Sequence, residues 1–412
     1  MCSNSVKWSG FDKRLRGTGN QKKSNNPNLH CCENTFYQFS ESIDLVQNRL
    51  VQWMGTSGFT MNKCHLKPFE FNETGRGLIA AMNIYAGDSL IEVPCSLIIT
   101  SRTVMSSYLK DSIKSFRLTP LAALCVFLVC ERCRGSSSPW HPYLLTLPYT
   151  YTVPVYWPSD LVERLPVAIK QRVLDQRKTV HKLYNKCQKI FNDVGQFCDE
   201  LKDNDISIQD FIWAWGTVNT RCVYWLQKPD PDLEPDGEDH YALVPFLDML
   251  NHSHQAQVTA GYNERSKSYK ISTDTAYSAG QQVFINYGPH SNMKLLLEYG
   301  FILENNPNNV IHIGEEDFLS ALQNHRDVSF LHLIYDNDLY NYKSRWFDCM
   351  EENYYVSVSH KTATRGILFR LLHIKMQQFQ YEMQDPHDPL EKIISKLCAD
   401  YQQIVRLCLQ GM

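Results

Sequence analysis

Two apolar runs, each followed by hydrogen-bonding side chains, place the strongest constraint on how this chain can fold. The run Val244–Leu250 is followed by Asn251 and His252, and the run Val283–Ile285 is followed one residue later by Tyr287. Apolar runs of this length are typical of buried segments. Asn carries both donors and acceptors, His has two distinguishable nitrogens, and Tyr adds a phenolic oxygen. The pattern predicts a buried site that can hold a heteroaromatic ligand such as adenine.

Other interpretations of the first motif remain open. Asp248, His252 and His254 form a carboxylate-and-two-histidine set of the kind that binds metals, although their spacing matches no defined coordination geometry. Asn251–Ser253 is also a glycosylation sequon, as is Asn72–Thr74, but a sequon matters only on a secreted surface. Taken alone, an Asn-His pair is more typical of a hydrogen-bonded turn.

A glycine-rich segment upstream superficially fits the dinucleotide-binding fingerprint, because Gly75, Gly77 and Ala80 occupy its small-residue positions. That fingerprint must open a helix. Here Ala86–Asp88 is a turn, and Leu90–Val93 alternates as a short strand before a proline. The segment therefore predicts a hairpin loosened by glycine, whose backbone can approach a ligand closely.

Four motifs stand in a fixed order along the chain: Gly75–Leu78, Leu243–Ser253, Phe284–Gly288 and Leu297–Phe301. In this order they resemble SET-domain methyltransferases, and specifically the split-SET group typified by the plant Rubisco large-subunit lysine methyltransferase. Trp213–Arg221 is similar to the helix that precedes the Asn-His-Ser loop in that group. The resemblance covers residues 68 to 305 well and the remainder in outline. It implies an α+β protein, with a β-rich SET fold split by a helical insertion and followed by a helical C-terminal domain.

The apolar spacing divides the chain into five regions. Residues 1–38 mix basic residues with Asn, Ser and Gly, which predicts a flexible basic tail. Residues 39–100 contain an opening helix and the first part of the SET domain, and residues 101–210 are helical in pattern and form the insertion. Residues 211–305 hold the second part of the SET domain, with strand patterns from Val244 to about Ile302. Residues 306–412 are again helical and correspond to the substrate-binding domain of the resembled group.

Composition bounds the class of protein. The chain has 412 residues, enough for two or three domains with a large core, and its net charge of -3 gives no overall attraction to nucleic acid. Its 14 cysteines are scattered through apolar segments, which indicates a reducing compartment. Cys130 and Cys133 form a pair, but no second pair follows at zinc spacing, so we expect no bound metal.

No targeting signal is evident. The N-terminus has no apolar core of the secretory type, and the longest apolar run, Leu121–Cys130, is far shorter than the about 20 residues that span a bilayer. We therefore expect a protein of the cytoplasm and nucleus, with no membrane association and no stable nucleic-acid binding.

The resemblance implies that S-adenosylmethionine is the cofactor. The backbone of the glycine-rich segment would touch it, and Asn251 and His252 would hold it by main-chain and amide contacts. Arg221 would meet its carboxylate, since a guanidinium pairs with a carboxylate through two bonds, and Asp248 would order the loop. The residues implied to bind the cofactor are Arg76, Gly77, Leu78, Arg221, Asp248, Asn251, His252 and Tyr287.

Tyr287 is the implied catalytic residue, and Tyr262, Tyr299 and Phe301 are the implied aromatic walls of the substrate channel. A lysine amine has a pKa of about 10.4, so the enzyme must bind or generate its neutral form in a narrow, partly dry channel. The sulfonium charge of the cofactor itself lowers the pKa of the amine, so no strong protein base is obligatory. A neutral phenol can align the amine without adding a counter-ion.

The sequence thus predicts a protein-lysine N-methyltransferase that uses S-adenosylmethionine and acts on a protein partner bearing the acceptor lysine. Histones are one candidate substrate. Two alternatives stay open. A relative in the split-SET group methylates histidine, and a non-catalytic module can keep the same fold for protein interaction.

Overall fold

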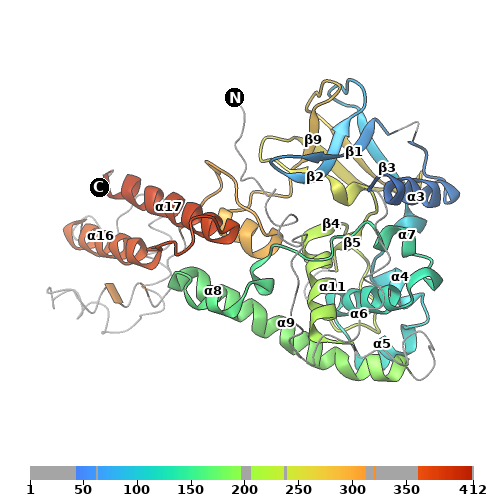
Figure 1. Cartoon of the computed structure of the whole chain (residues 1–412), viewed down its shortest axis with the longest axis horizontal. Coiled ribbons are helices and arrows are strands. Elements are labelled where there is room, and N and C mark those ends of the chain that lie inside the picture. The colour runs from blue at the N-terminus through green and yellow to red at the C-terminus, as the bar shows by residue number, and fades with distance from the viewer. Residues whose placement is uncertain are drawn as a thin grey trace, which may run out of the picture. The chain divides into compact units, whose positions relative to one another are not determined.

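The computed structural model describes residues 43–61, 64–195, 206–235, 239–311, 317, 320–321 and 361–410, and the predicted tail at 1–38 lies outside these. The chain forms two compact units (Figure 1). The first contains the described residues up to Pro158 together with Arg172–His290 and Lys294–Glu304. The second contains Ser159–Gln171, Ser291–Met293 and the described residues after Asn305.

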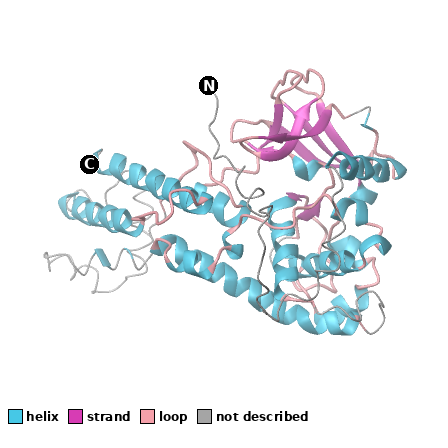
Figure 2. Ribbon diagram, viewed as in Figure 1, coloured by secondary structure: helices cyan, strands magenta, loops and turns pink. Residues whose placement is uncertain are grey.

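The strands of the first unit form three small sheets (Figure 2). The largest has the order β1 (Leu66–Phe71), β2 (Gly75–Ala80), β9 (Gln282–Ile285), β6 (Asn251–His252). The second has the order β3 (Ser89–Pro94), β8 (Ser268–Thr273), β7 (Val258–Asn263), and the third pairs β4 (Cys222–Tyr224) with β5 (Tyr241–Leu243). The glycine-rich segment is therefore a strand with no helix directly after it, as predicted, but its hairpin partner is β1. The predicted strand at Leu90–Val93 lies in β3, which pairs with β8 in the second sheet.

Strand β6 is the one parallel neighbour of β9 among the described strands, and this pairing brings the two polar motifs together. Asn251 lies opposite Phe284, and His252 lies opposite Ile285. Because β9 ends at Ile285, the chain leaves the sheet just before Tyr287. Parallel register thus places Asn251, His252 and Tyr287 in one small region, although about 35 residues separate them in sequence.

The opening helix is α3 (Ile43–Thr56), and the region after β3 is helical, as its pattern predicts. Helix α6 (Pro120–Cys133) begins with a proline at its first turn, and the Thr119 hydroxyl accepts a hydrogen bond from the Ala122 N–H. It is apolar on all sides and almost wholly buried. The other helices of this region are α4 (Ser101–Met105), α5 (Lys110–Phe116), α7 (His141–Leu144), α8 (Ser159–Glu163) and α9 (Val167–Val194).

Helix α11 (Ile208–Arg221) packs against α6 and leads directly into the site. A capping box starts it, in which Ser207 and Asp210 each accept a hydrogen bond from the other's backbone N–H. It ends at Arg221 because Cys222 has an extended backbone and begins β4. Arg221 therefore stands where a largely buried helix meets a strand.

One predicted strand region is wrong. The pattern predicts strands up to about Ile302, but Asn292–Lys294 is helical (α12), and Leu295–Tyr299 forms a π-helical turn (η6). The three consecutive leucines of η6 are all buried. The turn ends at Gly300, whose φ of +81° favours glycine, and a Cβ there would lie 2.7 Å from the Thr152 carbonyl carbon.

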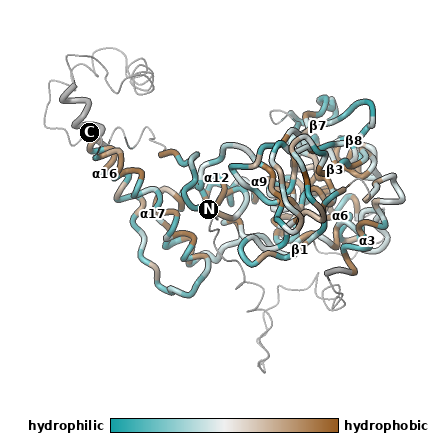
Figure 3. The backbone as a smooth tube through the Cα atoms, turned by 90° about the horizontal axis from the view of Figure 1, so that it is seen from above, coloured by the Kyte–Doolittle hydropathy of each residue, from teal (hydrophilic) through white to brown (hydrophobic). Residues whose placement is uncertain are grey.

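The second unit contains α16 (Lys361–Gln378) and α17 (Pro389–Gln410), with α8 and the first residues of α9. Apolar and polar residues alternate along α17 (Figure 3), and its apolar side is buried. The rings of Phe379 and Tyr401 stack 4.5 Å apart. The second unit also includes residues 159–171, which the sequence analysis placed in the insertion. None of the described helices is long and apolar enough to cross a bilayer.

Candidate active site

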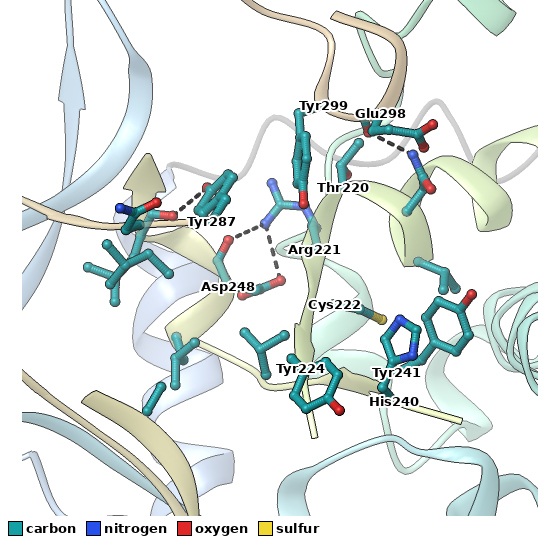
Figure 4. A pocket seen from close by; sticks show the side chains of 18 of the residues that line it. Thr220, Arg221, Cys222, Tyr224, His240, Tyr241, Asp248, Tyr287, Glu298 and Tyr299 are labelled. Atoms are coloured by element: carbon teal, nitrogen blue, oxygen red, sulfur yellow. Dashed lines mark hydrogen bonds and ion pairs between the residues drawn. The ribbon is translucent and has the colours of Figure 1, made fainter. Parts of the chain in front are cut away.

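A cavity of about 520 Å³ lies within the first unit (Figure 4). Its walls come from the end of α11, from β4 and β5, from the 3-10 turn η5 (Leu247–Met249), from β7 and β8, and from residues 285–299. These segments are distant in sequence, and only the folded first unit brings them together. Four of the predicted site residues line the cavity, namely Arg221, Asp248, Tyr287 and Tyr299.

An ion pair between Arg221 and Asp248 forms one wall of the cavity (Figure 4). Arg221 Nη1 donates to both the carboxylate and the backbone oxygen of Asp248, each at 3.1 Å, and the Tyr143 hydroxyl donates to the same carboxylate at 3.0 Å. The Asp248 side chain is 1% exposed. Burial is the largest influence and lowers the pKa of Arg221, but the Asp248 charge and hydrogen bond, together with Tyr151 and Tyr143, outweigh it, so the net pKa is raised. Arg221 is therefore charged, and Asp248 holds it in place.

Buried polar atoms of this pair lack partners. Asp248 Oδ1 and Arg221 Nε make no hydrogen bond within the part of the chain that the structure describes. An unsatisfied buried polar atom of this kind costs about 1–3 kcal/mol. Such atoms are common where a ligand completes the hydrogen bonding.

Arg76 brings a second positive charge close to this pair. It lies on β2, and burial together with repulsion from Arg221 lowers its pKa to about 10. The negative charge of Asp248 opposes this lowering of the Arg76 pKa, and Glu70 opposes it less strongly. Two guanidinium groups thus lie near the buried Asp248 carboxylate, which is paired with Arg221. The local charge is positive, which favours an anionic group such as a ligand carboxylate.

Asn251 ties β6 to β2. Its side-chain amide donates to the Arg76 backbone oxygen at 3.2 Å. A Cβ on Gly77 would lie 2.7 Å from the Asn251 amide nitrogen and 2.8 Å from that of Gln282, so only glycine fits there without displacing both amides. Leu78 is fully buried opposite Val283. The glycine-rich segment and the Asn-His motif are therefore in direct contact.

His252 is held as a neutral ring. Its Nδ1 accepts the Tyr287 backbone N–H at 3.1 Å, and burial lowers the pKa of His252 to about 4. Its Nε2 is buried without a partner among the described residues. Since Nδ1 accepts, Nε2 carries the hydrogen in the neutral ring. His252 thus adds a third buried polar atom that a ligand can satisfy.

Tyr287 presents a fixed, neutral phenol to the cavity. Its hydroxyl donates to the Leu250 backbone oxygen at 2.7 Å, and burial raises the pKa of Tyr287 well above its ordinary value. The ring lies 5.1 Å from that of His252 and 5.0 Å from that of Tyr299, measured between centroids. Phe301 meets the same ring edge-on at 6.5 Å. Because the hydroxyl hydrogen is donated to Leu250, the lone pairs of the Tyr287 oxygen remain available to accept a hydrogen bond from a ligand.

The remaining predicted residues do not line the cavity. Gly77, Leu78 and Asn251 belong to the strand layer of β2 and β6, and Phe301 contacts the rings of His252 and Tyr287. Tyr262 was predicted to line the substrate channel, but it is not part of the cavity wall. Its ring stacks on that of Trp225, with 4.6 Å between centroids. The suggested metal set is not assembled, since no group of three His, Cys, Asp or Glu side chains suited to a metal occurs among the described residues.

Several cavity residues carry no signal in the local sequence. Cys222, Tyr224, His240, Tyr241 and His290 line the walls, and Tyr143 reaches Asp248 from 105 residues away. Tyr224 and Tyr241 could be found only from the pairing of β4 with β5, which sets them opposite each other.

A family model, the SET domain, matches residues 75–288, which is more than half of the chain. The chain belongs to the SET-domain family. It is 39% identical over 273 residues to SET domain-containing protein 4 of Mus musculus, an alignment that covers 65% of this chain and 62% of that protein. It is 27% identical over 278 residues to the actin-histidine N-methyltransferase of Homo sapiens, covering 64% of this chain and 43% of that protein. The chain thus aligns with less than two thirds of the length of these curated relatives.

Solved structures confirm the SET fold predicted from the sequence. The SET domain of LSMT bound to lysine and AdoHcy aligns with a TM-score of 0.62 at 18% identity, covering 89% of this chain and 92% of that one. Rubisco LSMT bound to sinefungin and monomethyllysine aligns with a TM-score of 0.60 at 19% identity, covering 89% and 90%. The likeness at these identities is one of fold, and it extends beyond the SET domain into the helical C-terminal region.

Proposed function

We propose that this SET domain transfers the methyl group of S-adenosylmethionine to a lysine side chain of a protein. The observation that carries the proposal is the set of buried polar atoms without partners, Asp248 Oδ1, Arg221 Nε and His252 Nε2, gathered around a neutral tyrosine. LSMT, which shares the fold, binds AdoHcy and lysine.

The residues present fit this cofactor. The excess positive charge of Arg76 and Arg221 suits its carboxylate, and the space kept free by Gly77 lets its other parts approach the backbone of β2. Asn251 and the Nε2–H of His252 offer donors to a heteroaromatic ring. When bound, S-adenosylmethionine supplies an electrophilic methyl group on a positively charged sulfur.

The chain's own residues would orient the acceptor. Tyr287 and Tyr299 give the cavity aromatic walls, and aromatic faces attract an ammonium or methylated ammonium group. The Tyr287 oxygen, fixed by its bond to Leu250, can accept a hydrogen bond from the incoming nitrogen and hold it in line with the methyl group. Positioning of this kind supplies much of the rate.

A second candidate acceptor is histidine, because one family of relatives acts as actin-histidine N-methyltransferases. The aromatic walls favour lysine, whose positive charge they attract before and after methylation. We keep histones as one candidate substrate class, and the cytoplasm and nucleus as the predicted compartments.

Replacing Asn251 with alanine is expected to weaken S-adenosylmethionine binding about five- to hundredfold, equivalent to about 1–3 kcal/mol. The variant removes the amide that ties β6 to the Arg76 backbone and faces Gly77. Isothermal titration calorimetry with S-adenosylmethionine measures the affinity, and the melting temperature checks the fold. Asn263→Ala, at the exposed end of β7, is the matched control and should bind normally. Unchanged affinity in folded Asn251→Ala would remove Asn251 from the site.

A further inference from the structure

The π-helical turn η6 brings Tyr299 to the cavity wall. Backbone groups pair its first two oxygens. The Phe301 N–H donates to the Leu295 oxygen at 3.4 Å, and the Gly300 N–H donates to the Leu296 oxygen at 3.0 Å. The last oxygens of a helix have no partner within the helix. Because the chain turns away at Gly300, the next oxygens of η6 need partners from other parts of the fold.

Two side-chain amides supply these partners. The Gln176 amide, on α9, donates to the Leu297 oxygen at 2.9 Å. The Asn219 amide, on α11, donates to the Glu298 oxygen at 2.7 Å (Figure 4). Two helices thus hold successive carbonyl groups of the turn. Asn219 and Glu298 also line the cavity, whereas Gln176 is not part of its wall.

The Asn219 bond acts on the peptide group that carries Tyr299. The Glu298 oxygen and the Tyr299 nitrogen belong to one peptide unit, which is planar and includes the Tyr299 Cα atom. A bond that fixes this oxygen therefore also fixes the plane from which the Tyr299 side chain departs. The next residue, Gly300, lies against the Thr152 backbone. The main chain is thus held on both sides of Tyr299.

The place of the Tyr299 ring matters because the ring forms part of the wall that is proposed to hold the acceptor. Its centroid lies 5.0 Å from that of Tyr287 and 6.3 Å from that of Phe301. A gap of about 0.5–1 Å removes roughly a quarter to a half of a van der Waals contact. A small shift of the Tyr299 peptide would therefore loosen these contacts and change the width of the cavity.

Asn219 lies on the same helix as the arginine that the proposed function assigns to the cofactor. Helix α11 ends at Arg221, two residues after Asn219. The bond from Asn219 to Glu298 is separate from the ion pair of Arg221 with Asp248. Removing the Asn219 amide therefore leaves that ion pair in place and changes only the support of η6.

We propose that Asn219 is a positioning residue for methyl transfer, which sets the Tyr299 ring in the acceptor wall through the Glu298 carbonyl group. This inference rests on the proposed function, in which that wall holds the acceptor lysine. Asn219 acts through Tyr299, so without its amide the cofactor still binds and the acceptor is held less precisely. A bond that only stabilised the fold would act on transfer independently of Tyr299.

The test is a double-mutant cycle of Asn219→Ala and Tyr299→Leu. The rate is that of methyl transfer from saturating labelled S-adenosylmethionine to a limiting amount of heat-inactivated cell extract. Asn219→Ala should slow transfer about fivefold, the effect of one hydrogen bond. Added to Tyr299→Leu, it should slow transfer less than about twofold, because residues that act through one another are not additive. Asn219→Gln keeps an amide donor and should transfer faster than Asn219→Ala.

Asn83→Ala is the matched control and should transfer at the wild-type rate. The Asn83 amide oxygen also bonds to a distant backbone group, the Ala279 N–H at 2.9 Å, but Asn83 does not line the cavity. Calorimetry should give Asn219→Ala the wild-type affinity for S-adenosylmethionine within about threefold, since one ion pair and its neighbours still form that end of the site. The melting temperature checks the fold, and Asn219→Leu replaces Asn219→Ala if the latter does not fold.

Effects of Asn219→Ala and Tyr299→Leu that multiply in full would overturn the positioning role of Asn219. So would a loss of cofactor affinity that accounts for the slower transfer by Asn219→Ala. If Tyr299→Leu transfers too little label for the cycle, Asn219→Gln decides, and transfer no faster than that of Asn219→Ala would overturn the role. Wild-type protein that transfers no label would instead overturn the proposed function.

Discussion

Replacing Asp248 with alanine is expected to lower the free energy of unfolding by about 3–5 kcal/mol, the usual loss when one partner of a buried ion pair is removed. The change leaves Arg221 charged, only 15% exposed, and close to the second cation Arg76. It also removes the acceptor of the Tyr143 hydroxyl. Urea unfolding followed by tryptophan fluorescence measures the loss, because Trp213 and Trp215 lie on the same helix as Arg221.

Two further variants separate charge from hydrogen bonding. Tyr143→Phe removes one bond to Asp248 and should cost about 1 kcal/mol. Asp248→Asn keeps a hydrogen-bond acceptor for Arg221 and Tyr143. Its loss of unfolding free energy should lie between the losses for Tyr143→Phe and Asp248→Ala. A loss below about 1 kcal/mol for Asp248→Ala would show that the ion pair does not organise this wall of the cavity.

Replacing Tyr287 with phenylalanine is expected to slow methyl transfer by about tenfold or more, a loss of at least about 1.4 kcal/mol of transition-state stabilisation. The ring and its stacking on His252 and Tyr299 remain, so the affinity for S-adenosylmethionine should stay within a few-fold. The variant lacks the phenolic oxygen, which a hydrogen bond to the Leu250 backbone oxygen holds in place in the wild type. Single-turnover transfer at saturating cofactor isolates the chemical step.

The same chemical change at Tyr277 is the control for this variant. Its hydroxyl also donates to a backbone oxygen, that of Phe284, but Tyr277 does not line the cavity. Tyr277→Phe should therefore transfer methyl groups at the wild-type rate. Wild-type transfer by Tyr287→Phe would exclude the catalytic role, and lost cofactor binding would make Tyr287 a wall of the cofactor pocket.

Local patterns predicted the elements whose signal is local. Helix α6, a continuous apolar run, lies in the region 101–210 whose apolar spacing predicted helices. The π-helical turn at Leu295–Tyr299 could not be predicted in this way, because three adjacent leucines suit a buried strand as well as a buried helix. Only the tertiary packing around Gly300 decides between them.

The site was predictable where short motifs carry it and unpredictable where tertiary contacts do. Asn251, His252 and Tyr287 follow apolar runs, and the parallel pairing of β6 with β9 brings them together as expected. The bond from Tyr143 to Asp248 joins residues far apart in sequence. Tyr262 stacks on Trp225, a contact that no sequence period encodes.

The most direct test of lysine methylation is to incubate the protein with labelled S-adenosylmethionine and heat-inactivated cell extract, and to map the modified residues by mass spectrometry. The proposal predicts methyl groups on the Nε atom of lysine, with little label when Tyr287→Phe replaces the wild type. Label on a histidine ring would contradict the choice of acceptor. A folded wild-type protein that binds no S-adenosylmethionine and transfers no label would contradict the proposal that it is a methyltransferase.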